Sequence, residues 1–326
     1  MTAADRVPLR KTRLAVAGGT GFLGGYIVRA LLDARPAGIT VLNRRQLSGP
    51  PPAGVTAIRG DLDDERSLRR LCAGADVLVH AASRVDGTLN ECAAVNVRGT
   101  RTLLRAAAGE GVGRVIYIST TGVYEDGVHR GPAEDALPTR PASPASVTRL
   151  RAEKEVLAAG GTVIRPHLVY GAGDRWVVPA VAGLLRSVPA WIEGGRSRMS
   201  LIAADDLAGA VAALAVSPPA DPDPPAVLHA GHPAPASSRE LLTAVADALG
   251  LHTPSGDISL AKAGALLGTD RSPRRARLLS LLAVDHWYDC DKLWTVTGRA
   301  PGADLAAGFA RHASWYQQAY GLQVAA

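Results

Sequence analysis

The chain has 326 residues, of which 47% are hydrophobic and 20% are charged, and it carries a formal net charge of +6. This length predicts a large domain with an appended lobe, and the composition excludes a disordered chain. Basic residues are not interleaved with aromatic ones, which argues against a nucleic-acid-binding protein. The longest apolar stretch, Leu207–Val216, is too short to cross a bilayer, and the first residues do not resemble a secretory signal. We therefore expect a cytoplasmic protein that binds neither nucleic acid nor a membrane.

Three residue types are scarce enough to be checked one by one. Of the 36 basic residues only four are lysines, and the chain has seven tyrosines. The three cysteines, Cys72, Cys92 and Cys290, are isolated from one another and odd in number. This pattern predicts neither a disulfide framework nor a metal site.

Short apolar runs alternate with amphipathic stretches over roughly the first 200 residues. The strand-like runs are Leu14–Ala17, Ile39–Leu42, Val55–Ile58, Val77–His80, Val115–Ser119 and Thr162–Arg165. The helical patterns between them are Phe22–Leu32, Ser67–Cys72, Thr100–Ala108 and Leu150–Ala158. Strands and helices that alternate at this spacing predict an α/β fold with a doubly wound parallel sheet of the Rossmann type.

The pattern changes after Pro166, where Gly, Pro and Trp become frequent. We expect residues 1–166 to form the sheet domain, with 203–230 returning to it, and residues 167–326 to form a smaller C-terminal lobe that binds the substrate. The Pro-rich stretch Ser217–Pro225 is typical of a surface connection.

A glycine-rich turn follows the first predicted strand directly. Gly18, Gly21 and Gly24 are spaced three apart, and an amphipathic helix comes after them. In a dinucleotide site the first glycine permits the tight turn, the second admits the pyrophosphate, and the third lets the helix pack close to the sheet. The strand before and the helix after this turn therefore predict a dinucleotide-binding site.

The second predicted strand ends in Asn43, Arg44 and Arg45. An NAD site would place an acidic residue here for the ribose hydroxyl, whereas guanidinium groups can bind a 2′-phosphate through two hydrogen bonds. The sequence therefore favours NADP(H), the alternative being two solvated surface arginines.

Further motifs follow in an order that resembles the extended short-chain dehydrogenase/reductase family over nearly the whole chain. They are Gly60–Leu62, Val79–Ala82, Asn96–Thr100, Arg114–Tyr124, Arg165–Gly171, Ala204–Ala208 and Trp315–Tyr316. Together with the glycine turn and the two arginines, the resemblance implies a set of cofactor-binding residues. These are Gly18, Thr20, Gly21, Phe22, Leu23, Gly24, Asn43, Arg44, Arg45, Asp61, Leu62, Ala81, Ala82, Ser83, Asn96, Ser119, Arg149 and Pro166.

The same resemblance implies a Tyr-x-x-x-Lys pair, in which the tyrosine donates a proton and the lysine binds the ribose. Here Ala145 stands in the place of the tyrosine and Arg149 in the place of the lysine, with matching flanks on both sides. Only Tyr288 is followed four residues later by a lysine, Lys292. That match lies in the C-terminal lobe, and we interpret it as structural.

Two residues are candidates for the remaining chemistry. Thr120 matches the family's Ser or Thr that hydrogen-bonds the substrate carbonyl, but an aliphatic hydroxyl is a poor acid. His167 follows Pro166 in the segment that the resemblance places beside the nicotinamide, and histidine can titrate near neutral pH. We therefore predict Thr120 and His167 as catalytic residues, with a purely structural His167 as the alternative.

These features lead to an NADPH-dependent ketoreductase as the favoured hypothesis. The substrate would be a hydroxylated aromatic polyketide, because a neighbouring phenol, or solvent, can supply the proton that the missing tyrosine would give. The chain resembles an atypical ketoreductase of an angucyclinone (simocyclinone-type) pathway. Two alternatives stay open: a non-catalytic NADP(H)-binding sensor, and a nucleotide-sugar epimerase or dehydratase with Arg196 and Arg198 near the sugar-nucleotide phosphates. The oligomeric state is left open.

Overall fold

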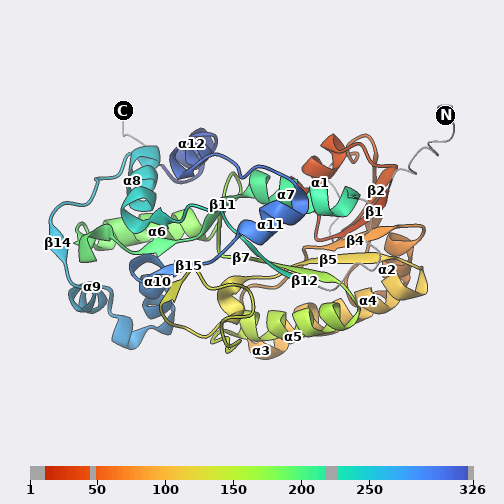
Figure 1. Ribbon diagram of the computed structural model, residues 1–326, viewed down its shortest axis with the longest axis horizontal. Helices are drawn as coiled ribbons and strands as arrows, with labels where there is room; N and C mark the ends of the chain where they lie inside the picture. The colour runs from red at the N-terminus through yellow and green to blue at the C-terminus, as the bar shows by residue number, and fades with distance from the viewer. Residues whose placement is uncertain (1–11, 45–48, 218–225, 322–326) are drawn as a thin grey trace, which may run out of the picture. The chain divides into compact units, whose positions relative to one another are not determined.

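The computed structural model describes residues 12–44, 49–217 and 226–321. Seven strands form one sheet in the order β12-β7-β5-β4-β1-β2-β3 (Figure 1). The neighbouring pairs from β7 to β3 are all parallel. The strands are β1 (Arg13–Ala17), β2 (Gly38–Asn43), β3 (Val55–Arg59), β4 (Val77–His80), β5 (Arg114–Ile118), β7 (Thr162–Pro166) and β12 (Ala226–Ala230). A parallel sheet that grows outward from β1 in both directions is the doubly wound Rossmann fold, so the predicted fold class is confirmed.

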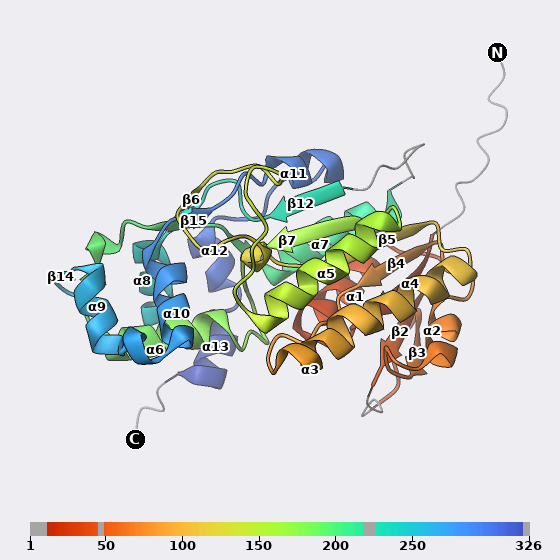
Figure 2. The ribbon, with the colours of Figure 1, turned by 90° about the horizontal axis from the view of Figure 1, so that it is seen from below.

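The helices that connect these strands cover both faces of the sheet. They are α1 (Phe22–Asp33), α2 (Glu65–Cys72), α3 (Leu89–Ala93), the π-helix η1 (Ala94–Gly99), α4 (Thr100–Gly109) and α5 (Pro144–Ala158). Figure 1 shows α1 on one face and α2, α4 and α5 on the other, and Figure 2 shows α3, α4 and α5 side by side.

The predicted strands and helices are confirmed, with the largest difference at α5. This helix begins at Pro144, several residues before the predicted start at Leu150. The reason is its first turn, where the Ser143 side chain accepts a hydrogen bond from the Ser146 amide and proline occupies the first helical position. Both features favour a helix start.

The described residues form two compact units. The first unit contains the described residues of Met1–Ser119, Ser143–Ile164 and Val211–Val227. The second unit contains the described residues of Thr120–Ala142, Arg165–Ala210 and Leu228–Ala326. In the first unit, Leu68 and Leu71 of α2 and Leu103 of α4 pack with the inner side chains of the sheet. Each of these leucines is fully buried, which stabilises the fold by about 1.5–3 kcal/mol per side chain.

The second unit contains small sheets and a helical core. Its strands are β6 (His129–Arg130), β8 (Leu168–Tyr170), β9 (Trp191–Ile192), β10 (Arg198–Met199), β11 (Leu201–Ala203), β13 (Ala236–Ser237), β14 (Asp257–Ile258) and β15 (His286–Trp287). The largest of these sheets has the order β13-β10-β15-β6. Its helices are α6 (Val177–Ser187), α8 (Ser238–Leu249), α9 (Leu260–Leu267), α10 (Pro273–Ala283), α11 (Asp291–Thr297), α12 (Leu305–Ala310) and α13 (Ala313–Tyr320), and α7 (Ala204–Val216) starts in this unit. Leu184 of α6 and Leu241 and Val245 of α8 lie at the centre of its core.

Candidate active site

The glycine turn has the geometry that a dinucleotide site needs. Gly18 has a φ of +88°, and a Cβ placed on it would overlap the backbone of Ala81 and Ala82 at the end of β4. A Cβ on Gly24 would overlap the carbonyl of Gly18, so this glycine lets α1 pack against the turn. Around Gly21, by contrast, the described residues leave room, because a Cβ there would meet only the Gly18 oxygen at 3.3 Å.

The first turn of α1 leaves its amide groups available for an anion. Gly21 precedes the helix and supplies no side-chain cap, and Thr20 is exposed in the turn before it. The amides of Phe22, Leu23 and Gly24 have no intrahelical acceptor at this position of a helix. A pyrophosphate is the group that such amides and the helix dipole bind, so this turn fits the predicted cofactor.

The end of β2 carries a second feature that fits a nucleotide. Asn43 is buried, and its side-chain oxygen Oδ1 has no hydrogen-bonding partner in the described part of the chain. A buried acceptor without a donor costs free energy unless a ligand supplies the donor. Arg44 is exposed beside it, whereas Arg45 lies outside the described residues.

The end of β3 is shaped by its own hydrogen bonds. The amide of Leu62 donates to the Asp61 carboxylate at 2.7 Å, and the Ser67 hydroxyl donates to the Asp64 carbonyl at 2.9 Å. These bonds fix the turn after the strand, and buried Leu62 packs into the core. The predicted cofactor-binding residues Asp61 and Leu62 therefore lie on a well-supported turn next to the end of β2.

Asn96 is the centre of a buried polar network in the first unit. Its Oδ1 accepts hydrogen bonds from the Arg84 amide at 2.7 Å and the Ser83 hydroxyl at 3.3 Å. Its Nδ2 donates to the Arg84 carbonyl and to Thr148 Oγ1, both at 2.9 Å. Asn96 thus uses both donors and both acceptors of its side chain. It lies in the π-helix η1, a distortion often found at functional sites, and it connects the segment after β4 to α5.

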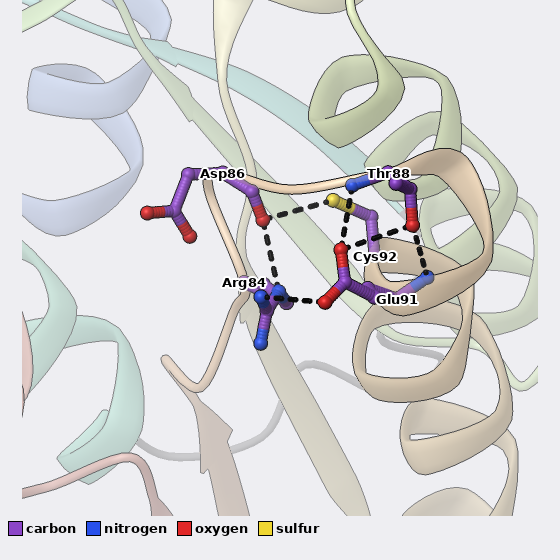
Figure 3. A network of polar contacts seen from close by, with 5 residues as sticks. All are labelled: Arg84, Asp86, Thr88, Glu91 and Cys92. Atoms are coloured by element: carbon purple, nitrogen blue, oxygen red, sulfur yellow. Dashed lines mark hydrogen bonds and ion pairs between the residues drawn. The ribbon is translucent and has the colours of Figure 1, made fainter.

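The segment between Ser83 and η1 is held by a network that the sequence analysis missed (Figure 3). Thr88 and Glu91 form a capping box at the start of α3, and Arg84 pairs with the Glu91 carboxylate at 3.2 Å. The Thr88 hydrogen bonds and the Arg84 charge lower the pKa of Glu91. The Cys92 thiol donates to the Asp86 carbonyl at 3.4 Å. The Thr-x-x-Glu spacing before a helix was the sequence signal that could have revealed this network.

Arg149 is used differently from the lysine whose place it takes. Its Nη2 donates to the carbonyls of Ser119 at 2.7 Å and Ile118 at 3.1 Å, at the end of β5. Its Nε is buried and finds no acceptor among the described residues, and Ser119 Oγ has no partner there either. The Arg149 charge adds to burial in lowering the pKa of His80 to about 3.

The segments that leave β5 and β7 carry the two predicted catalytic residues, and both belong to the second unit. Thr120 Oγ1 accepts a hydrogen bond from the Gly122 amide at 3.1 Å. The next residue, Thr121, is hydrogen-bonded through Oγ1 to Nδ1 of His167 at 2.8 Å. Pro166, the last residue of β7, is buried directly before His167. Burial, with smaller contributions from three neighbouring histidines, lowers the pKa of His167 well below its usual value.

Tyr288 lies close to these residues in the second unit, although it is far from them in sequence. Its ring centroid is 5.4 Å from that of His167 and 5.8 Å from that of Tyr124, which follows the Thr121 turn. Tyr288 is buried, whereas Lys292 is exposed in α11. The interpretation of Tyr288 as merely structural missed this contact, because no sequence signal links residues so far apart.

Two general features of the described residues bear on the kind of site. They contain no group of three or more His, Cys, Asp or Glu side chains arranged to hold a metal ion. Within the same ranges, no helix is both long enough and apolar enough to span a membrane.

The fold and the glycine turn define a dinucleotide-binding α/β protein, and comparison with known proteins identifies the family. A model of the NAD dependent epimerase/dehydratase family matches residues 14–228. The chain belongs to this family, and it is therefore an NAD(P)-dependent enzyme.

Individual relatives cover the chain to different extents. A 4-hydroxy-2-methyl-3-oxo-4-farnesyl-3,4-dihydroquinoline-1-oxide ketoreductase from Stigmatella aurantiaca is 33% identical over 56% of this chain and 58% of its own length. A 2-alkyl-3-oxoalkanoate reductase from Stenotrophomonas maltophilia is 29% identical over 92% of this chain and 98% of its own length. Among solved structures, the dTDP-glucose 4,6-dehydratase DesIV from Streptomyces venezuelae, with NAD bound, aligns with a TM-score of 0.71. The alignment covers 94% of this chain and 97% of the DesIV chain at 24% identity. At this identity the likeness is one of fold alone.

Proposed function

We propose that the chain is an NADPH-dependent ketoreductase that reduces a carbonyl of a hydroxylated aromatic polyketide without a tyrosine proton donor. The observation that carries this proposal is the contrast between α5 and the edge of the sheet at which β1 and β2 end. The edge keeps the glycine turn and the unpartnered Asn43 oxygen, whereas α5 has Ala145 and Arg149 in place of the tyrosine and lysine. Arg149 donates to the carbonyls of β5. This contrast supports a cofactor site that works without the usual proton donor.

The chain's own residues would divide the work as follows. The amides at the start of α1 would bind the pyrophosphate, Asn43 and the turn at Asp61 would border the adenosine, and Arg44 with Arg45 would bind the 2′-phosphate. NADPH, when bound, supplies the hydride. Thr120 would orient the ketone, because a hydroxyl can stabilise developing negative charge on the carbonyl oxygen. The proton would come from the substrate or from solvent.

The choice of substrate class rests on proximity. A phenol next to the ketone is held close to the oxygen that gains negative charge, which gives it a high effective concentration as an acid. Two of the relatives named above are reductases of oxo compounds, which supports a ketone as substrate. A nucleotide-sugar epimerase or dehydratase is a weaker candidate, because those reactions need the tyrosine for their redox step.

The reductase activity is tested with a panel of aromatic ketones that carry a hydroxyl peri to the carbonyl, each paired with its O-methyl ether. We expect NADPH oxidation with members of the panel, and faster reduction of the free phenols than of their ethers. No NADPH oxidation with any ketone would contradict the proposal. Tight NADPH binding combined with that result would favour the non-catalytic sensor instead.

Cofactor preference is measured separately by fluorescence titration with NADPH and NADH at physiological salt. We expect NADPH to bind more tightly, and we expect Arg44→Gln combined with Arg45→Gln to remove the preference, because the 2′-phosphate then loses its guanidinium partners. Equal affinity of the native protein for NADH and NADPH would overturn the assignment.

The glycine turn provides a matched pair of variants for the same titration. In Gly24→Ala the new methyl group overlaps the Gly18 carbonyl, and overpacking of this kind costs about 1–3 kcal/mol, so we expect roughly tenfold to hundredfold weaker NADPH binding. In Gly25→Ala, at the next position of α1, the methyl group meets only the Gly19 oxygen at 4.0 Å, so binding should be unchanged.

A further inference from the structure

One tryptophan of the second unit differs from the others in its exposure. The side chain of Trp176 is 51% exposed, whereas Trp191 and Trp294 are buried and the other two tryptophans are half-buried. Tryptophan is highly buried on average, because its ring system carries a large apolar area. The other large hydrophobic side chains that are exposed in the described ranges are aliphatic. Trp176 is therefore the flat, aromatic member of that group.

The backbone that carries Trp176 is fixed by a buried carboxylate. We call Gly171–Trp176, which joins β8 to α6, the tryptophan loop. Asp174 is 1% exposed, and its Oδ1 accepts hydrogen bonds from the amides of Trp176 at 2.7 Å and Val177 at 3.0 Å. Its Oδ2 accepts a third from the Val178 amide at 2.9 Å. A carboxylate bonded to backbone amides makes stronger hydrogen bonds than a neutral acceptor, so the loop is held firmly at the start of α6.

The C-terminal helix α13 holds the same loop through two tyrosines (Figure 2). The Gly171 amide donates to the Tyr316 hydroxyl at 2.7 Å. That hydroxyl has two acceptors within reach, the Gly171 carbonyl at 3.1 Å and Asp174 Oδ2 at 3.3 Å. The Tyr320 hydroxyl donates to the Asp174 carbonyl at 2.9 Å. Because Tyr316 is fully buried and its ring stacks on Phe309 at 5.1 Å, α13 is a rigid support for the loop.

Exposure on a rigid backbone is the combination that a binding surface for a flat ligand needs. A loop that must be ordered on binding costs free energy, and a loop fixed in advance avoids this cost. Tryptophan supplies a large contact area with few rotatable bonds, which is why it is favoured in binding surfaces. Stacking of one aromatic ring on another uses the whole face of both rings and tolerates different substituents. A ligand that covers the indole also removes its apolar area from water.

The tryptophan loop follows the segment that carries a predicted catalytic residue. β8 begins at Leu168, directly after His167, and the loop begins directly after β8 ends at Tyr170. His167, the loop and Thr120 all belong to the second unit. The residue proposed to orient the ketone and the exposed indole are therefore carried by one compact unit.

We propose that Trp176 is a specificity-determining residue whose indole stacks on the aromatic rings of the substrate, an inference that rests on the proposed ketoreductase function. Tyr316 is a positioning residue that acts through the tryptophan loop. A flat aromatic ketone then binds in preference to a saturated ketone of the same size, because puckered rings cannot bring a whole face against the indole. Trp176 itself takes no part in the transfer of hydride or proton.

Binding is tested by isothermal titration calorimetry with NADP⁺ present, so that no ketone can be reduced. The probes are a tetralone with a hydroxyl peri to its carbonyl, and decalone, the saturated ketone with the same two-ring skeleton. In Trp176→Ala we expect roughly tenfold to hundredfold weaker binding of the tetralone and little change for decalone. Trp176→Phe keeps a flat ring and should lose less than Trp176→Ala. Unchanged tetralone binding in Trp176→Ala, or equal losses for both ketones, would overturn the proposal.

A second exposed side chain of the same unit provides the matched control. Leu266 in α9 is 57% exposed and lies outside the tryptophan loop, so Leu266→Ala should leave the tetralone affinity unchanged. Thermal unfolding of Leu266→Ala and Trp176→Ala should stay close to that of the native protein, because both side chains are exposed. A loss of affinity confined to Trp176→Ala is then a loss of contact with the ligand. An equal loss in Leu266→Ala would contradict stacking on the indole.

The positioning role of Tyr316 is tested by a double-mutant cycle. Tyr316→Phe keeps the ring that stacks on Phe309 but removes the hydroxyl bonded to Gly171, so we expect roughly threefold to tenfold weaker tetralone binding. In a Trp176→Ala background the same substitution should cause no further loss, because its effect passes through the indole. Equal losses in both backgrounds would show that Tyr316 supports the unit in general, and would overturn its positioning role.

Turnover separates failure of this inference from failure of the proposed function. If the native protein oxidises NADPH with the tetralone, Trp176→Ala should raise KM with little change in kcat, because stacking stabilises bound substrate and transition state alike. An unchanged KM would overturn the role of Trp176 and leave the ketoreductase standing. Tetralone binding that depends on Trp176, without NADPH oxidation by any aromatic ketone, would contradict the ketoreductase and leave the binding surface in place. Neither binding nor turnover would overturn both.

Discussion

Two of the buried polar networks among the described residues satisfy their hydrogen bonds to different degrees. Around Asn96, in the first unit, each donor and acceptor of the amide has a partner. In the second unit, where the rings of His129, His167, His229 and His286 gather around Tyr288, Nε2 of His167 and Nε2 of His286 are both buried with no partner among the described residues. A buried polar group without a partner costs about 1–3 kcal/mol, so a network built only for stability would not keep two. The side chain at the centre of the first network is fully satisfied, whereas the second network leaves two buried ring nitrogens without partners among the described residues.

The largest expected difference between the two networks is in how they respond to low pH. Burial lowers the pKa of His229 and of His286 from 6.5 to about 4. As pH falls through this window the unfolded chain binds protons that the folded chain cannot, so stability falls. A shift of this size corresponds to roughly 3 kcal/mol for each ring at pH 4.

The measurement is the free energy of unfolding between pH 7 and pH 4. His286→Gln should have a shallower pH dependence than the native protein, whereas His252→Gln, at an exposed position, should not. An Asn96→Ala variant should keep the native slope, because the hydrogen bonds of the Asn96 side chain go to Ser83, Arg84 and Thr148 and not to a histidine. If the free energy of unfolding of the native protein and of His286→Gln depends equally on pH, the predicted contribution of His286 is wrong.

Removal of the Asn96 side chain should cause the next largest effect. Asn96→Ala removes four hydrogen bonds, to the Arg84 amide and carbonyl, the Ser83 hydroxyl and Thr148 Oγ1, at a cost of about 3 kcal/mol. Asn90→Ala, at an exposed position in α3, is the control and should change stability by less than about 1 kcal/mol. Denaturant unfolding of both variants measures the difference in the free energy of unfolding. Similar losses of stability would show that Asn96 contributes no more than an exposed asparagine.

Arg149→Met should have an intermediate effect. The methionine keeps much of the apolar stem but loses both hydrogen bonds to the end of β5, so we expect a loss of about 1–3 kcal/mol. Arg151→Met, at an exposed position of the same helix, should be nearly neutral. If thermal unfolding shows no difference between these two variants, the Arg149 hydrogen bonds do not stabilise the strand end.

The exposed network of Figure 3 should show the smallest effect. Thr88→Ala removes the cap of α3 and should cost about 1 kcal/mol, and Thr88→Ser, which keeps the hydroxyl, should restore it. High salt should weaken the exposed Arg84–Glu91 pair but leave the Asn96 network unchanged. Thermal unfolding at two salt concentrations checks both statements.

Much of the first unit could be predicted because its signals are local. Apolar runs mark the strands, and Gly18, Gly21 and Gly24 mark the turn by their spacing alone. The absence of tyrosine and lysine at 145 and 149 could be read in the same way, because the flanking motifs fix the register. The use that Arg149 makes of its guanidinium could not, since its acceptors are backbone carbonyls that every residue carries.

The second unit was predicted only as a lobe, because its arrangement depends on contacts between distant residues. β6 and β15 are two residues long, too short for any periodicity, and yet their pairing places His129 opposite His286. The sequence predicts His167 as a site residue, but no local pattern in it predicts the contacts of His167 with Thr121 and Tyr288.

Arg149 also bears on whether the proposed departure from the Tyr-x-x-x-Lys pair can be reversed. Its two hydrogen bonds to the end of β5 make the residue part of the sheet's support. A mutation of Ala145 to tyrosine would leave that tyrosine without its lysine, and a mutation of Arg149 to lysine would first loosen the strand. On the proposed assignment, each single step back is neutral or harmful, and only the double change could be advantageous. Selection acting on one substitution at a time would then keep Ala145 and Arg149 in place.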